Sequence, residues 1–250
     1  MSNKQKIIAS LKNYQSSAKN QKKVYVPTLE QEINIGNLNA KHQRKLIEAS
    51  LDNPVMRCLF HVNIYEILID IVEDKEIIKK LRMEDRDAIL IQLRYYFIDE
   101  NYDGRSLKQT VDCIRELKTH LEVKQEIYED NSYKIHLRIP SLVDDKIVSE
   151  YYVKSKRHDD MSKDTIRRSL GELLMVEISK YVSHITIKGD EDIEIDLDSY
   201  SIPDKLEILD NMDRKFVNIV TDFIKNAKDS YKSIYKLGKK DIQIEPQFFV

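Results

Sequence analysis

Glycine and proline are scarce in this chain, and their scarcity limits the folds that it can adopt. Five glycines and five prolines occur in 250 residues, so few positions favour tight turns. The two closest glycines are Gly171 and Gly189. No G-x-G-x-x-G, G-x-x-x-x-G-K-[ST] or G-x-S-x-G motif can therefore occur, which excludes glycine-built phosphate loops and a nucleophile elbow. The composition favours a fold rich in helix.

Charge and cysteine content point to a protein made and kept inside a cell. The 41 basic and 43 acidic residues give a formal net charge of -2. Cys58 and Cys113 are too far apart in sequence for a C-x-x-C metal site and too few for a disulfide framework. No apolar run approaches the roughly 18 residues of a membrane span, and residues 1–20 lack the apolar stretch of a secretory signal. We therefore expect no membrane partner.

Residues 1–23 form a basic N-terminal arm. The arm contains no acidic residue and six lysines, which are Lys4, Lys6, Lys12, Lys19, Lys22 and Lys23. Such an arm is typical of binding to nucleic acid or to an acidic partner, but the spread of the lysines, with Tyr14 as the one aromatic residue among them, favours a solvated helix or terminus. Ile7, Ile8 and Leu11 have the spacing of a short amphipathic helix.

Residues 24–122 have the pattern of a mainly helical domain. A strand pair is expected at 24–26 and 33–35, and Asn39 is a candidate N-cap for the helix that follows. Further helical stripes occur at 65–72, at 89–97 and at 107–121.

The pattern changes over residues 123–200. Tyr133, Ile135 and Leu137 alternate with polar residues, as in a half-buried strand. A helix is expected at about 164–182, and a second hairpin turns at Gly189. The segment therefore predicts an α+β module of hairpin, helix and hairpin.

Residues 201–250 predict a long C-terminal helix followed by an extended apolar tail. The helix is expected to begin at Ser201 or Pro203 and to end by Gly238. Taken together, the chain is predicted to be α+β and predominantly helical.

No candidate catalytic, cofactor-binding or metal-binding residue emerges from the sequence. The six histidines show no i, i+3 or i, i+4 pairing and no H-E-x-x-H motif. The acidic stretch 190–198 lacks the pattern of a calcium loop and alternates with apolar residues, so it is interpreted as the solvated face of a strand. Cys58 and His61 could form a nucleophilic pair, but their i, i+3 spacing is the only observation that favours this interpretation.

The aromatic C-terminus is the most unusual local feature. Phe248 and Phe249 either fill the protein's own core or contact a partner, because exposed apolar patches usually mark contacts. As candidate partner-binding residues we select Ile244, Phe248 and Phe249.

Several segments, taken in order, resemble the baseplate hub proteins of T-even-type tailed phages. They are residues 24–29, 32–33, 38–47, 87–95, 137–142 and 244–249. The similarity runs from about residue 24 to residue 250 and leaves the lysine-rich arm outside. The marked residues include Pro27 in the lead-in, Pro140 after the strand and the aromatic ending.

The resemblance implies a non-enzymatic tail protein that binds other baseplate hub or tail proteins, as an assembly chaperone or as a retained structural subunit. It also implies a place in the host cytoplasm during virion assembly or in the tail baseplate of the bacteriophage. Two alternatives remain open. The first is a nucleic-acid-binding protein that uses the lysine-rich arm. We expect nucleic acid less than a protein as the partner. The second is a cell-wall hydrolase with a carboxylate pair assembled in space.

Overall fold

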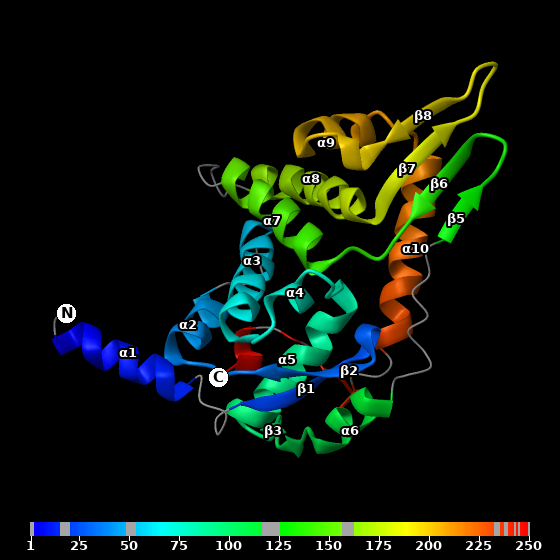
Figure 1. The fold of residues 1–250 in the computed structure, drawn as a ribbon. Coiled ribbons are helices and arrows are strands. Elements are labelled where there is room, and N and C mark those ends of the chain that lie inside the picture. The colour runs from blue at the N-terminus through cyan, green and yellow to red at the C-terminus, as the bar shows by residue number, and fades with distance from the viewer. Residues whose placement is uncertain are drawn as a thin grey trace.

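The computed structural model describes residues 3–15, 21–48, 54–116, 126–156, 163–232, 236–237, 240–242, 244 and 246–249. Figure 1 shows an upper part that contains a sheet with helices beside it, and a lower part that is mainly helical. The mixed α+β and predominantly helical class expected from the sequence is confirmed.

The N-terminal part consists of a helix, a strand pair and a group of helices. Its elements are α1 (Asn3–Gln15), β1 (Lys22–Val26), η2 (Pro27–Leu29), β2 (Gln31–Ile35), α2 (Ala40–Glu48), α3 (Pro54–Ile71), α4 (Lys75–Ile78), α5 (Met83–Phe97), β3 (Asn101–Tyr102), β4 (Arg105–Ser106) and α6 (Lys108–Glu116). The strands β1 and β2 pair in antiparallel register. Asn39 caps α2 as expected, because its Oδ1 accepts the His42 amide at 3.0 Å. The boundary expected at 122–123 and the end of the stripe at Leu121 lie outside the described residues.

The middle part contains two hairpins and two helices. Its elements are β5 (Glu126–Glu129), β6 (Tyr133–Leu137), α7 (Leu142–Lys156), α8 (Lys163–Tyr181), β7 (Val182–Ile187), β8 (Ile193–Asp196) and η4 (Leu197–Ser199). The hairpins join into one antiparallel sheet of order β5-β6-β7-β8. The sequence predicted one helix between the hairpins. This prediction was wrong, because two helices, α7 and α8, lie between β6 and β7. Ser141 begins α7 with a reciprocal cap, in which its Oγ accepts the Asp144 amide and Asp144 accepts the Ser141 amide, both at 3.1 Å.

The C-terminal part differs from the expected single long helix and extended tail. It contains α9 (Ile202–Asp210), α10 (Arg214–Lys232), β9 (Lys236–Leu237), β10 (Lys240–Asp241) and η5 (Pro246–Phe249). The helix breaks at residues 211–213 because Asp213 Oδ1 accepts the Phe216 amide at 2.9 Å and begins a new helix. Residues Pro246–Phe249 form a short 3-10 turn, where the sequence predicted an extended segment.

A single large cluster of buried apolar residues extends from Val24 to Phe249. A smaller cluster joins α3, α7 and α8 through Cys58, Val148, Tyr152 and Val176. The helix α3 contacts both α7 and α8 and lies between the upper and lower parts in Figure 1. The packing around α3 therefore positions the two parts relative to each other.

The first turn of α5 carries two buried carboxyl groups. Asp85 accepts the Thr28 amide and the Arg82 amide, each at 2.9 Å, and so fastens η2 to the start of the helix. Its neighbour Glu84 is 5% exposed. Burial raises the pKa of Glu84 to about 7, and the charge of Asp85 adds to the effect.

We predict that Glu84 makes the protein less stable as the pH rises. The folded pKa is above the unfolded value of 4.5, so the folded state binds more protons between these two values. The free energy of unfolding should therefore fall by about 3 kcal/mol from pH 4.5 to pH 7 and change little above. Urea unfolding of Glu84→Gln across this range should show a flatter profile. The exposed Glu207→Gln should retain the wild-type profile, and an unchanged slope in Glu84→Gln would contradict the assignment.

Candidate functional site

The aromatic tail lies in the core, so the interpretation of Phe248 and Phe249 as exposed partner anchors does not describe this structure. Phe248 is 0% exposed and Phe249 is 1% exposed. The Phe248 ring lies 4.9 Å from the ring of Tyr102 and the Phe249 ring 6.2 Å from that of Phe60, between centroids. Arg94 Nη1 donates to the Phe248 carbonyl. The tail thus fills the core, which is the other alternative that the sequence left open.

The third candidate, Ile244, is half-buried and packs against the same cluster. The turn η5 packs against α2. Phe248 and Phe249 therefore contact each other as core residues, and Ile244 packs against the same core. The physical reason is that burial of the large apolar surfaces of two adjacent rings outweighs the conformational entropy lost when this segment becomes ordered.

We predict that Phe249→Ala lowers the free energy of unfolding by about 3 to 5 kcal/mol, because it leaves a cavity beside Phe60. Urea unfolding measures the loss. Tyr200→Ala serves as the control, since Tyr200 is 46% exposed. If Phe249→Ala unfolds like the wild-type protein, the tail does not belong to the core.

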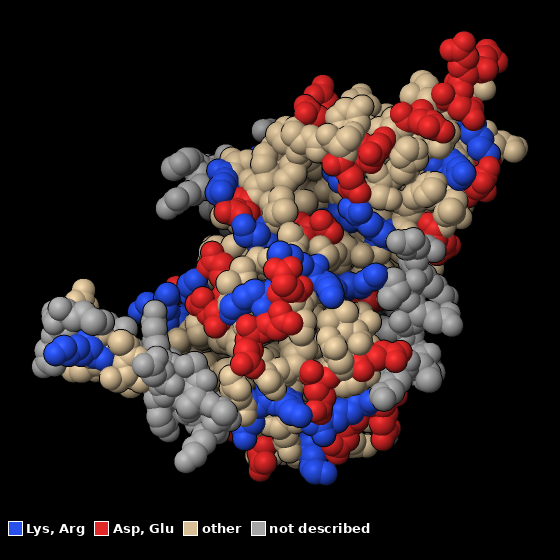
Figure 2. Space-filling view, viewed as in Figure 1, with Lys and Arg blue, Asp and Glu red and all other residues tan. Residues whose placement is uncertain are grey.

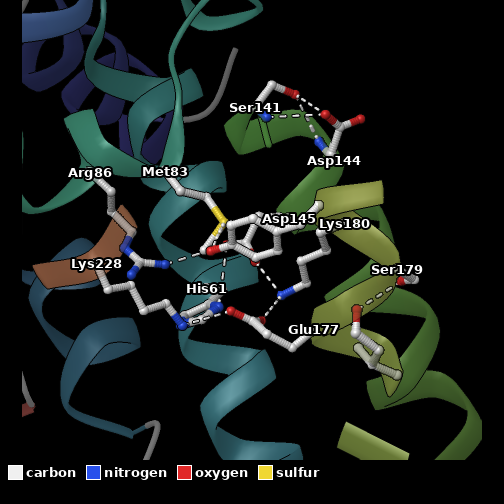
Figure 3. Close-up of polar contacts among 12 residues, drawn as sticks. His61, Met83, Arg86, Ser141, Asp144, Asp145, Glu177, Ser179, Lys180 and Lys228 are labelled. Atoms are coloured by element: carbon white, nitrogen blue, oxygen red, sulfur yellow. Dashed lines mark hydrogen bonds and ion pairs between the residues drawn. The ribbon is translucent and has the colours of Figure 1, made fainter. Parts of the chain in front are cut away.

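A buried network of charged side chains joins four helices. Lys180 of α8 donates to Asp145 of α7 at 2.7 Å and to Glu177 of its own helix at 2.8 Å. Asp145 also lies 3.5 Å from Arg86 Nη1 of α5 and 3.3 Å from His61 Nδ1 of α3. Figure 3 shows these groups converging from four helices.

The network continues to α10, where Lys228 donates to the second carboxylate oxygen of Glu177 at 2.9 Å. Charges of opposite sign therefore alternate from Arg86 through Asp145, Lys180 and Glu177 to Lys228. Each buried carboxylate contacts two cationic groups, which offsets much of the cost of removing it from water. The sequence analysis missed this network, because its members lie on separate helices and no local spacing connects them.

The protonation states follow from these contacts. Burial raises the pKa of Asp145, but His61 and Lys180 outweigh it and hold that pKa well below its usual range. Burial lowers the pKa of Lys180, but the two carboxylates outweigh it and raise that pKa above the ordinary value. Burial lowers the pKa of His61 although Asp145 opposes the change. At neutral pH the network therefore contains charged lysine and carboxylates beside a neutral imidazole.

The pair Cys58 and His61 lies on α3 next to this network. Burial raises the pKa of the Cys58 thiol to about 11. A thiol with this pKa carries little thiolate at neutral pH and is a poor nucleophile. The neighbouring His61 contacts Asp145 with Nδ1. The two residues are neighbours, as their spacing requires, but the environment does not activate the sulfur.

A pocket of about 410 Å³ lies between α3, α5, α8 and α10 beside the network. Its walls include His61, Arg86, Lys180 and Lys228. Leucines of α8 also line it. The lining therefore combines hydrogen-bond donors with apolar surface.

Within the described ranges, no group of three or more histidine, cysteine or acidic side chains could hold a metal ion. The acidic stretch lies on β8 and η4, where Asp196 and Asp198 are exposed. Figure 2 shows its carboxylates in red at the tip of the β7–β8 hairpin. None of the described helices combines the length and the apolar character needed to cross a membrane.

Comparisons with known proteins add no family to this picture. No family model, no curated protein and no solved structure matches the chain.

We predict that Lys180→Met lowers the free energy of unfolding by about 3 to 5 kcal/mol, because it leaves Asp145 and Glu177 buried without their shared cation. Urea unfolding at neutral pH measures the effect. The matched control is Lys225→Met on α10, whose side chain is exposed. A Lys180→Met variant with the wild-type unfolding midpoint would show that the carboxylates do not depend on this ammonium.

Proposed function

We propose that this protein is a non-enzymatic phage tail protein that binds other baseplate hub proteins, either to promote hub assembly or as part of the hub. The assignment to the hub rests on the ordered segments between residues 24 and 249 that resemble that family. Its expected locations are the host cytoplasm during assembly and the tail baseplate.

The observation that carries the binding proposal is the exposed apolar face of α1. This helix projects from the rest of the molecule in Figure 1. Ile7 and Leu11 lie one turn apart, and each is 55% exposed. Apolar side chains exposed at this spacing suit insertion of an amphipathic helix into a groove of a partner.

The charge of α1 indicates which kind of partner groove it would bind. Lys4 and Lys6 are exposed on the helix, which contains no acidic residue. Figure 2 shows blue and tan atoms on this helix. The proposed partner surface is therefore an apolar groove with acidic residues at its rim. Burial of the C-terminal tail leaves α1 as the better candidate for the interface.

We predict that Ile7→Asp combined with Leu11→Asp abolishes capture of hub proteins. A short epitope inserted between Gly189 and Asp190, in the exposed hairpin tip, keeps both termini free. The tagged protein is purified from infected cells after mild crosslinking, and mass spectrometry identifies what accompanies it. Ile69→Asp is the control, because Ile69 is 41% exposed on α3.

Each outcome of this purification has a different meaning. Enrichment of hub proteins by the wild type and the control alone supports both the function and the interface. Equal enrichment by all variants contradicts the role of α1. Absence of hub proteins from the wild-type sample contradicts the proposed function. Recovery of nucleic acid, lost at high salt and on deletion of residues 1–23, would favour the nucleic-acid alternative.

A further inference from the structure

The pocket beside the buried network has the size and composition of a small-molecule site. Its volume of about 410 Å³ falls within the range of roughly 300 to 1,000 Å³ found for ligand pockets. It lies where four helices meet, which is a common place for such sites in helical proteins. Neither the proposed partner interface on α1 nor the packing of the tail uses it.

One wall of the pocket is apolar and partly exposed. It is formed by leucines of α8, together with Cys58 and Met83. Leu170 and Leu174 are 49% and 39% exposed, respectively. These side chains would gain from being covered by an apolar group.

The charged side chains of the lining carry more positive than negative charge. The cationic side chains that line the pocket are Arg57, Arg86, Lys180 and Lys228. Glu177 is the acidic residue among the lining residues, and Asp145 lies directly behind His61 and Lys180. Asp87 pairs with Arg86 Nε at 3.2 Å. With these three carboxylates included, one positive charge remains in excess. The imidazole of His61 adds none, because burial lowers its pKa.

Lys228 is a cation of the network that a ligand in the pocket could reach. Its side chain is 33% exposed, and its ammonium donates to Glu177 Oε1 at 2.9 Å. An ammonium group has three protons to donate. Figure 3 shows Lys228 close to Arg86 and His61, at the side of the network that faces away from α7.

We infer that this pocket binds a small amphipathic anion. Its carboxylate, sulfonate or phosphate group would lie against Lys228 and Arg86, and its apolar body against Leu173 and Leu174. The positive excess selects an anion over a cation, and the apolar wall selects an organic anion over an inorganic one. Binding of such an anion is a property of the purified protein and does not depend on the proposed tail-assembly function.

The test uses anilinonaphthalene sulfonate, an aromatic sulfonate whose fluorescence rises on binding, and the uncharged dye Nile red. We expect one saturable site for the sulfonate on the purified full-length protein. Lys228→Gln should weaken sulfonate binding about tenfold, because it removes one charge from the wall, and should change Nile red binding much less. Lys225→Gln on the same helix is the matched control, since its exposed side chain does not line the pocket.

A second variant tests the apolar wall without altering the network. Leu174→Asp should also weaken sulfonate binding, whereas Ile69→Asp, at similar exposure on α3, should not. Circular dichroism confirms that each variant is folded. Several weak sites, or binding unaffected by both Lys228→Gln and Leu174→Asp, would overturn the inference.

Discussion

The buried ammonium of Lys180 is the interaction on which the relative placement of the helices depends. It bonds Asp145 of α7 and Glu177 of α8, and Asp145 in turn contacts His61 of α3 and Arg86 of α5. An unpaired charge in such a position costs several kcal/mol. The four helices are therefore held in the one register that pairs every member, whereas apolar contacts alone would tolerate small shifts.

The helix α3 connects this network to the second buried contact, the C-terminal tail. His61 faces the network, while its neighbour Phe60 packs on Phe249. The sequence of α3 is apolar around most of its circumference, as is typical of a helix that is largely buried, and its exposed residues include Glu66, Ile69 and Asp70. The tail, bonded through the Phe248 carbonyl to Arg94, adds to that burial from the lower part of the molecule.

Local patterns predicted the elements whose neighbours are close in sequence. The alternation of residues 133–137 gave β6 with its buried and half-buried faces, and Asn39 began α2. The helix α7 escaped prediction because its inner face carries Asp145 and Ser149, which interrupt any apolar stripe. Asp145 is acceptable there only because Lys180 lies opposite, and that pairing joins residues 35 positions apart.

The same reasoning explains why the candidate site could not be read from the sequence. The tail was recognised as apolar, but no periodicity indicates what covers two adjacent rings at a chain end. The pocket required knowledge of four helices at once. The break between α9 and α10 depended on a single side chain, Asp213, that competes with the continuing helix by capping the next one.

Most of the charged groups that line the pocket belong to the network. Signs alternate along a chain of six groups that runs from Asp87 through Arg86, Asp145, Lys180 and Glu177 to Lys228. The charges of these six groups balance, so the positive excess around the pocket comes from Arg57, the fourth cation of its lining. Arg86, Lys180 and Lys228 all line the pocket, whereas the carboxylates of Asp145 and Glu177 are each held between two cationic groups. The contacts that fix the helices thereby also place cationic groups in the lining of an open, partly apolar pocket.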